Sequence, residues 1–118
     1  METPEHYKGK MQPVEFIVKS RWSFIQGNIL KYVMRYQKKD GIKDLEKAVH
    51  YCELGIRLHD TRVSFNPDYI KQFIEANDFV EPEWMSTLME EISFARWHVV
   101  KMLIEPLKEY CHVEGPDN

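Results

Sequence analysis

Positively charged side chains recur at helical spacing in the first half of the chain. Steps of three, four and three residues separate the members of a first stripe, which consists of Asn28, Lys31, Arg35 and Lys38. An α-helix turns by about 100° per residue, so these side chains share one helix face. Three cations on one face repel one another and are not required for folding. A bound anion would relieve the repulsion, so the pattern favours a site for a phosphate-bearing ligand.

A second stripe follows after a short turn and consists of Asp44, Lys47 and Tyr51. Lys47 would add a fourth cation to the site, and Arg35 would offer a two-pronged contact to phosphate. Asp44 is the carboxylate best suited to position a reacting group, so Asp44 and Arg35 are the catalytic candidates. Two other interpretations stay open. In one, the charges are ordinary solvated helix surface. In the other, Asp44 only stabilises the positive end of the second helix dipole.

The same stretch carries a spaced motif, GN-x-x-KY-x-x-R followed by K-x-x-G-x-x-DL-x-KA-x-x-Y. A His-Tyr pair and a P-x-E-F-I segment precede it. Together these motifs resemble the SaV-like family of small bacteriophage proteins. The residues that carry the resemblance are His6, Tyr7, Pro13, Glu15, Phe16, Gly27, Asn28, Lys31, Tyr32, Arg35, Lys38, Gly41, Asp44, Leu45, Lys47, Ala48 and Tyr51.

The resemblance implies a nucleotide-binding protein. The family includes a phage kinase that acts on deoxynucleoside monophosphates without a phosphate-binding glycine loop. The implied activity is therefore nucleoside monophosphate phosphorylation in the host cytoplasm, with ATP as the phosphate donor. His6 and Tyr7 would fold back to close the ligand site, and Asn28 or Tyr51 would contact sugar or base. Two other functions stay open: sequestration of a nucleotide or immune signal without turnover, and inhibition of a host protein.

Several familiar site motifs are incomplete in this sequence. The five glycines do not form the G-x-x-x-x-G-K-[ST] loop of common kinases, so any phosphoryl transfer would rely on lysine and arginine. His50-x-Cys52 and Cys111-His112 lack the spacing of a zinc framework. Glu90 and Glu91 resemble only part of the magnesium motif of the all-helical nucleotide pyrophosphohydrolases. The sequence therefore predicts no metal ligands.

Composition places the chain among ordinary globular proteins. It has 118 residues, of which 43% are hydrophobic and 30% charged, with a net charge of −3. That charge argues against nucleic-acid binding, which normally requires a basic surface. No apolar run reaches the ~18 residues of a membrane span, and the first ten residues lack a signal-peptide pattern. We therefore expect a cytoplasmic protein without membrane contact, whose two cysteines are reduced.

Periodicity and capping residues predict an all-α fold of about five helices in a single domain, 1–118. A helical hairpin over 23–39 and 42–59 forms the core of a nucleotide-binding part, 1–60. A shorter helix over 12–20 precedes the hairpin, with Pro13 in its first turn. Asn66-Pro67 predicts the start of another helix, which extends to Ala76. The remainder, 61–118, is a helical extension.

One long helix is predicted over 82–105, and it carries two apolar stripes. The first stripe consists of Trp84, Leu88, Ile92, Ala95, Val99 and Met102. The second consists of Met85, Met89, Val100 and Ile104. A helix that is apolar on two sides is either central to its domain or buried between subunits. Because so short a chain has few elements to surround it, we expect a homo-oligomer that associates through this helix, with a host protein as the alternative partner.

Overall fold

The computed structural model describes residues 11–111. Every regular element in that range is helical, so the predicted all-α fold is confirmed. The elements are α1 (Pro13–Lys19), α2 (Phe24–Arg35), α3 (Ile42–Arg57), α4 (Pro67–Ala76), α5 (Pro82–Ser93), α6 (Trp97–Ile104) and the 3-10 helix η2 (Glu105–Tyr110). The described residues thus form six α-helices, against the five or so that the sequence predicts.

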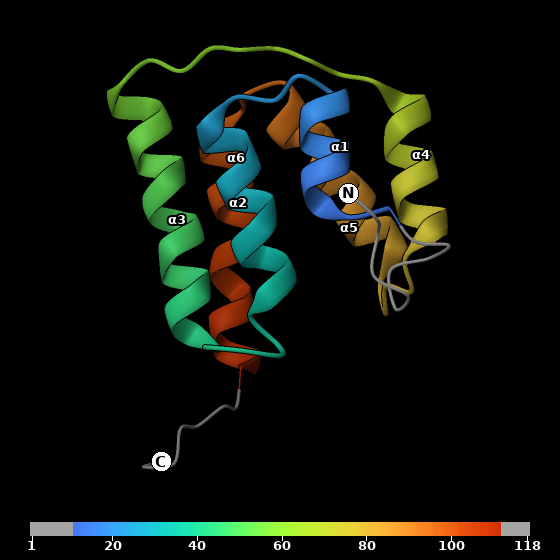
Figure 1. Cartoon of the computed structure of the whole chain (residues 1–118). Helices are drawn as coiled ribbons and strands as arrows, with labels where there is room; N and C mark the ends of the chain where they lie inside the picture. The colour runs from blue at the N-terminus through green and yellow to red at the C-terminus, as the bar shows by residue number, and fades with distance from the viewer. Residues whose placement is uncertain (1–10, 112–118) are drawn as a thin grey trace.

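The helices lie in two groups on either side of α2. Figure 1 shows α3, α2 and α6 side by side, with α1, α5 and α4 on the other side of α2. A long connection across one end of the molecule joins α3 to α4. One hydrophobic core draws on helices from both halves of the sequence, because α3 packs on α6 and α1 packs on α4. No helix within residues 11–111 is both long and apolar enough to cross a membrane.

The start of α2 is fixed by a fully buried glutamine. The Ser23 hydroxyl accepts a hydrogen bond from the Gln26 amide, and the Ser23 amide donates to Oε1 of Gln26, which is a capping box. The side-chain amide of Gln26 also donates to the carbonyl oxygens of Arg62 and Ile92, both at 2.9 Å. One side chain therefore ties α2 to the crossing connection and to the end of α5.

The predicted hairpin is present, with its first helix shorter than expected. That helix ends at Arg35, and residues 36–40 form the turn before α3. Gly41 has a φ of 56°, and its amide donates to the carbonyl of Tyr36 at 3.0 Å. This left-handed conformation suits glycine and reverses the chain. Lys38 consequently lies in the turn and does not continue the helical stripe.

The single long helix predicted over 82–105 is wrong, because the chain bends between α5 and α6. The amide of Arg96 donates to the Glu91 carbonyl at 3.1 Å, and the amide of Ala95 donates to the Ile92 carbonyl at 2.9 Å. This pair of bonds is a Schellman motif, in which the residue after the helix cap turns left-handed. That residue is Ala95, with a φ of 54°.

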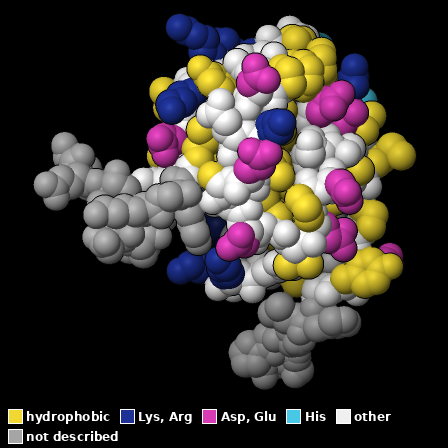
Figure 2. All heavy atoms as spheres, turned by 90° about the vertical axis from the view of Figure 1, so that its right-hand side faces the viewer, with side chains coloured by type: hydrophobic (Ala, Val, Ile, Leu, Met, Phe, Trp, Pro, Cys, Tyr) yellow, Lys and Arg dark blue, Asp and Glu magenta, His cyan; other side chains and the backbone are white. Residues whose placement is uncertain are grey.

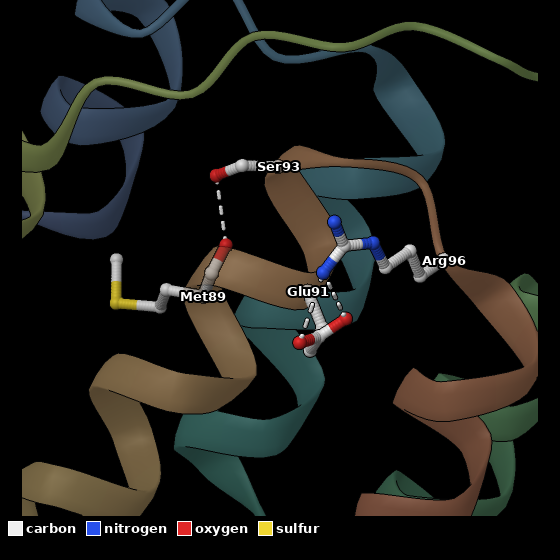
Figure 3. A network of polar contacts seen from close by, with 4 residues as sticks. All are labelled: Met89, Glu91, Ser93 and Arg96. Carbon is white, nitrogen blue, oxygen red and sulfur yellow. Dashed lines mark hydrogen bonds and ion pairs between the residues drawn. The ribbon is translucent and has the colours of Figure 1, made fainter.

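Side-chain hydrogen bonds also stabilise this bend, as Figure 3 shows. The Ser93 hydroxyl donates to the Met89 carbonyl at 2.8 Å inside the last turn of α5. The guanidinium of Arg96 reaches back to the Glu91 carboxylate, with 3.1 Å between Nη1 and Oε1. Both contacts bind the residues around the bend to the end of α5.

The same device ends two other helices. Arg21 follows α1 with a φ of 58°, and His59 follows α3 with a φ of 57°. In each case the next amide donates to a carbonyl five residues earlier, from Trp22 to Ile17 and from Asp60 to Gly55. None of these left-handed residues is glycine, so the usual sequence mark of a helix end is missing.

The bend changes the argument for an oligomer. The whole second stripe is buried within the chain, and so are Leu88 and Ile92 of the first. Of the ten residues in the two stripes, only Val99 and Met102 are exposed. Six short helices therefore cover what one long helix would have left exposed. Self-association through this region stays a prediction and rests on α6 alone.

Two helical glycines mark close packing between helices. A Cβ on Gly55 of α3 would lie 2.7 Å from the ring of Trp97, whose indole N–H donates to the Asp60 carbonyl at 2.8 Å. A Cβ on Gly27 of α2 would lie 3.0 Å from Cγ2 of Ile17. Gly27 thus leaves room for a side chain of α1.

The first prediction concerns the bend. Ala95→Gly should raise the free energy of unfolding by up to about 1 kcal/mol, because glycine adopts the left-handed conformation without the steric cost of a Cβ. Ala76→Gly in α4, where φ is not positive, should lower it by a similar amount. Urea unfolding measures both variants. Destabilisation by Ala95→Gly equal to that of Ala76→Gly would show that the bend is not present.

The second prediction concerns the packing of α6 on α3. Gly55→Ala should lower the free energy of unfolding by about 1–3 kcal/mol, because the rigid indole of Trp97 cannot move without losing its hydrogen bond. Gly27→Ala is the matched change, and its Cβ would lie 3.0 Å from the nearest atom of Ile17, against 2.7 Å from Trp97 for Gly55→Ala. Its cost should be smaller because this contact is less close, while the gain in helix propensity is the same at both positions. Equal costs for both glycines would contradict the close fit of Trp97 against α3.

Candidate functional site

Three cations surround one aromatic ring where α2 packs against α3. The Nζ atoms of Lys31 and Lys47 lie 5.5 and 5.2 Å from the centre of the Tyr32 ring, and Cζ of Arg35 lies 5.7 Å from it. All three distances fall within the range of cation–π attraction, worth about 0.5–1 kcal/mol each at exposed sites. Side chains from both predicted stripes therefore converge on Tyr32. We call these four residues the Tyr32 cluster.

A second aromatic ring extends this surface toward the start of α2. Tyr51 of α3 stacks on Tyr32, with 6.0 Å between ring centres and 15° between ring planes. Phe24 meets the edge of Tyr51, also at 6.0 Å, and is itself 75% exposed. His50 lies on the other side of Tyr51. The cluster thus continues into an exposed aromatic surface on the same two helices.

Asp44 lies beneath the cluster and is fully buried. Its Oδ2 accepts a hydrogen bond from the Asp40 amide at 3.1 Å and lies 3.8 Å from Nε of Arg35. The guanidinium also lies 3.9 Å from the Asp40 carboxylate. Within residues 11–111, Oδ1 of Asp44 and Nε of Arg35 have no hydrogen-bond partner. Asp44 therefore braces the turn and holds Arg35 by charge, at a distance longer than a hydrogen bond.

Lys31 and Lys47 differ from Arg35 in their charge environment. Both side chains are exposed, and neither forms an ion pair with any described residue. Arg35 has two carboxylates beside it and keeps 37% of its side chain exposed. By contrast, Lys101 of α6 is paired with Glu53 at 3.0 Å. Two lysines are thus left around one ring without a neutralising group in the described part of the chain.

The remaining predicted site residues are Asn28, Lys38, His6 and Tyr7. Asn28 is half-buried on the same helix face, and its amide donates to the Phe24 carbonyl at 2.9 Å. Lys38 is exposed in the turn, where only its backbone contact to Arg35 is defined. His6 and Tyr7 fall outside the described residues.

Tyr32 and Phe24 are the site residues that helix-face reasoning left out. Tyr32 lies four residues after Asn28 and three before Arg35, so its spacing places it on the stripe. Tyr32 is overlooked when only the charged residues of the stripe are considered. Phe24 also lies on that face, four residues before Asn28. An exposed aromatic beside a cation stripe was the available signal.

The buried cysteine of α3 is a protonated thiol at neutral pH. Burial is the main cause that raises the pKa of Cys52 to about 12. Because the thiolate is the nucleophilic form, Cys52 is not poised to attack an electrophile. Cys52 packs in the core, whereas His50 of the same motif is exposed.

Comparison with known proteins adds one match. Residues 1–53 match the model of a family described as proteins of unknown function, DUF3310. The matched segment is somewhat less than half of the chain and includes α1, α2 and most of α3, with the Tyr32 cluster. No curated protein and no solved structure matches the chain.

The third prediction concerns the role of Arg35. Arg35→Ala should lower the free energy of unfolding by about 1–2 kcal/mol, because Asp44 would keep a buried charge without its cation. Lys31→Ala removes a surface charge that has no ion-pair partner among the described residues, and it should cost less than about 1 kcal/mol, the size of one exposed cation–π contact. Urea unfolding of both variants makes the comparison.

A double-mutant cycle with Asp44→Ala isolates the interaction. If the two charges act on each other, the loss caused by Arg35→Ala should shrink by at least about 0.5 kcal/mol once Asp44 is absent. An unchanged loss would show that Arg35 contributes by packing alone.

Proposed function

We propose that the chain binds a nucleotide on the face formed by α2 and α3. The observation that carries this proposal is a pair of lysines, Lys31 and Lys47, that lie beside the ring of Tyr32 and form no ion pair within residues 11–111. A phosphate group placed between them would be neutralised from both helices. The resemblance to the SaV-like phage proteins supplies the class of ligand, a deoxynucleoside monophosphate.

Phosphate and base would occupy different parts of this face. The cations lie around Tyr32, and the exposed ring of Phe24 lies beyond Tyr51 toward the start of α2. Bases stack on exposed aromatic rings with about 1–3 kcal/mol per base. A base beside Phe24 and Tyr51 would leave its phosphate within reach of the lysines. Asn28 lies between the two regions along α2 and would contact the sugar.

This geometry supports binding more directly than phosphoryl transfer. Asp44 is fully buried, so its role in this proposal is to position Arg35 and the turn. Phosphoryl transfer depends on positioning and on cations that neutralise developing charge, and Lys31, Arg35 and Lys47 are of the required kind. Turnover in a phage-type kinase therefore stays a prediction, and sequestration of the nucleotide without turnover uses the same site.

The fourth prediction tests the site by calorimetry. A deoxynucleoside monophosphate should bind the parent protein, and the matching deoxynucleoside without phosphate should bind at least about tenfold more weakly. Lys31→Ala and Lys47→Ala should each weaken nucleotide binding about fivefold, which corresponds to about 1 kcal/mol. Neither lysine forms an ion pair with a described residue, so both variants should keep the fold and report on the ligand.

Lys71→Ala provides the matched control. Lys71 is an exposed lysine of α4. Figure 2 views the molecule from the side on which α4 lies in Figure 1, and carboxylates are spread there among hydrophobic side chains. Its loss should leave the affinity unchanged. If Lys31→Ala and Lys47→Ala bind as tightly as the Lys71→Ala control, the proposed site is wrong. A product assay with ATP on the same samples then separates a kinase from a sequestering protein.

A further inference from the structure

A cavity of about 560 Å³ lies on the opposite face of α2 from the Tyr32 cluster. It is lined by the end of α2, the segment between α4 and α5, the start of α5, and the end of η2. Its volume falls within the range of small-molecule sites, about 300–1,000 Å³. No feature of the proposed nucleotide site uses this cavity.

The lining combines aromatic rings with a single carboxylate. Its aromatic residues are Tyr36, Phe79, Trp84 and Tyr110. Glu81 is the only carboxylate among the described lining residues, and these include no lysine, arginine or histidine. In a chain with sixteen lysines and arginines, a sizeable cavity without one differs sharply from the α2–α3 face. The lining therefore has negative charge and electron-rich rings.

The end of α2 adds to this negative character. The C-cap residue of α2, Tyr36, lines the cavity, so the carbonyl end of the helix dipole lies there. Glu81 precedes the first residue of α5, where its carboxylate offsets the positive end of that helix. Burial raises the pKa of Tyr36, and the carboxylate of Glu81 contributes in the same direction. The charge of Glu81 is thus felt within the cavity.

Trp84 stands out among the three tryptophans. Trp22 and Trp97 are buried and donate their indole N–H groups to the carbonyls of Ser64 and Asp60. Trp84 is only half-buried and makes no such bond to the residues that the structure describes. Phe79, in contrast, is held against Phe73 with 5.8 Å between ring centres. Both rings thus pack against the core, but the indole N–H of Trp84 has no hydrogen-bond partner among the described residues.

We propose that this cavity binds a small organic cation, a quaternary ammonium or protonated amine, between Trp84, its neighbouring rings and Glu81. Aromatic faces attract such cations, tryptophan most strongly, and rings grouped with a carboxylate are the usual arrangement for ammonium recognition. An anionic ligand is disfavoured by Glu81, and a neutral apolar ligand would gain nothing from it.

Choline and its uncharged isostere 3,3-dimethylbutan-1-ol test this site on the full chain. The two probes have nearly the same shape and differ in the charge of one atom. Calorimetry follows binding, and so does the change in tryptophan fluorescence, which should come from Trp84 because the other two tryptophans are buried and do not line the cavity. Choline should bind in the millimolar range or tighter, and at least about tenfold more tightly than the isostere.

Two variants complete the experiment. Glu81→Gln, at an exposed position, should weaken choline binding at least about threefold and leave the isostere unaffected, whereas Glu109→Gln outside the lining should change neither. Trp84→Leu should abolish preference for choline. Equal affinity for both probes, no choline binding in the millimolar range, or an unchanged choline affinity in Glu81→Gln would each overturn the proposal.

Discussion

The antiparallel packing of α2 against α3 is the constraint from which the rest of the site follows. The turn at residues 36–41 sets the register of the two helices, and that register brings Tyr32 opposite Lys47 and Tyr51. A shift of one residue along either helix would turn these side chains by about 100° and separate the cluster. Gln26 fixes α2 at its other end, because its amide is held by carbonyls from two distant segments. The cluster is thus held in place by contacts that serve the fold.

The cations on this face have different roles. Arg35 lies above a fully buried carboxylate and belongs partly to the fold. Lys31 and Lys47 contribute less to it, since each is exposed and lies over a tyrosine ring without an ion-pair partner in the described part of the chain. A buried ion pair is costly to break, whereas a surface cation can be removed at little cost. This difference explains why the lysines, and not Arg35, report on a ligand.

Helix periodicity predicted the class of fold, the hairpin and the face that carries the cations. It also placed α4, because Asn66 accepts a hydrogen bond from the Tyr69 amide and Pro67 follows it. It missed the bend at Ala95, since alanine favours continued helix and only the surrounding packing makes it turn left-handed. It also missed that Asp44 would be buried. A charged residue in a first helical turn gives no sign of that, and only the position of the turn against Arg35 determines it.

The two proposed sites lie on opposite faces of α2 and have opposite charge character. The α2–α3 face presents cations around aromatic rings, and the cavity presents aromatic rings around a carboxylate. A phosphate-bearing ligand and an organic cation would therefore be sorted by charge between two sites that share one helix. Either site can fail its test while the other stands.

Backbone chemical-shift mapping tests the central claim most directly. Amide resonances of the 15N-labelled chain would be followed while a deoxynucleoside monophosphate is added. The account predicts that the largest changes fall on residues 28–35 and 47–51, on both helices at once, and that they diminish as salt is raised. Largest changes on α4 and α5, or around Trp84, with residues 28–35 unaffected, would contradict it.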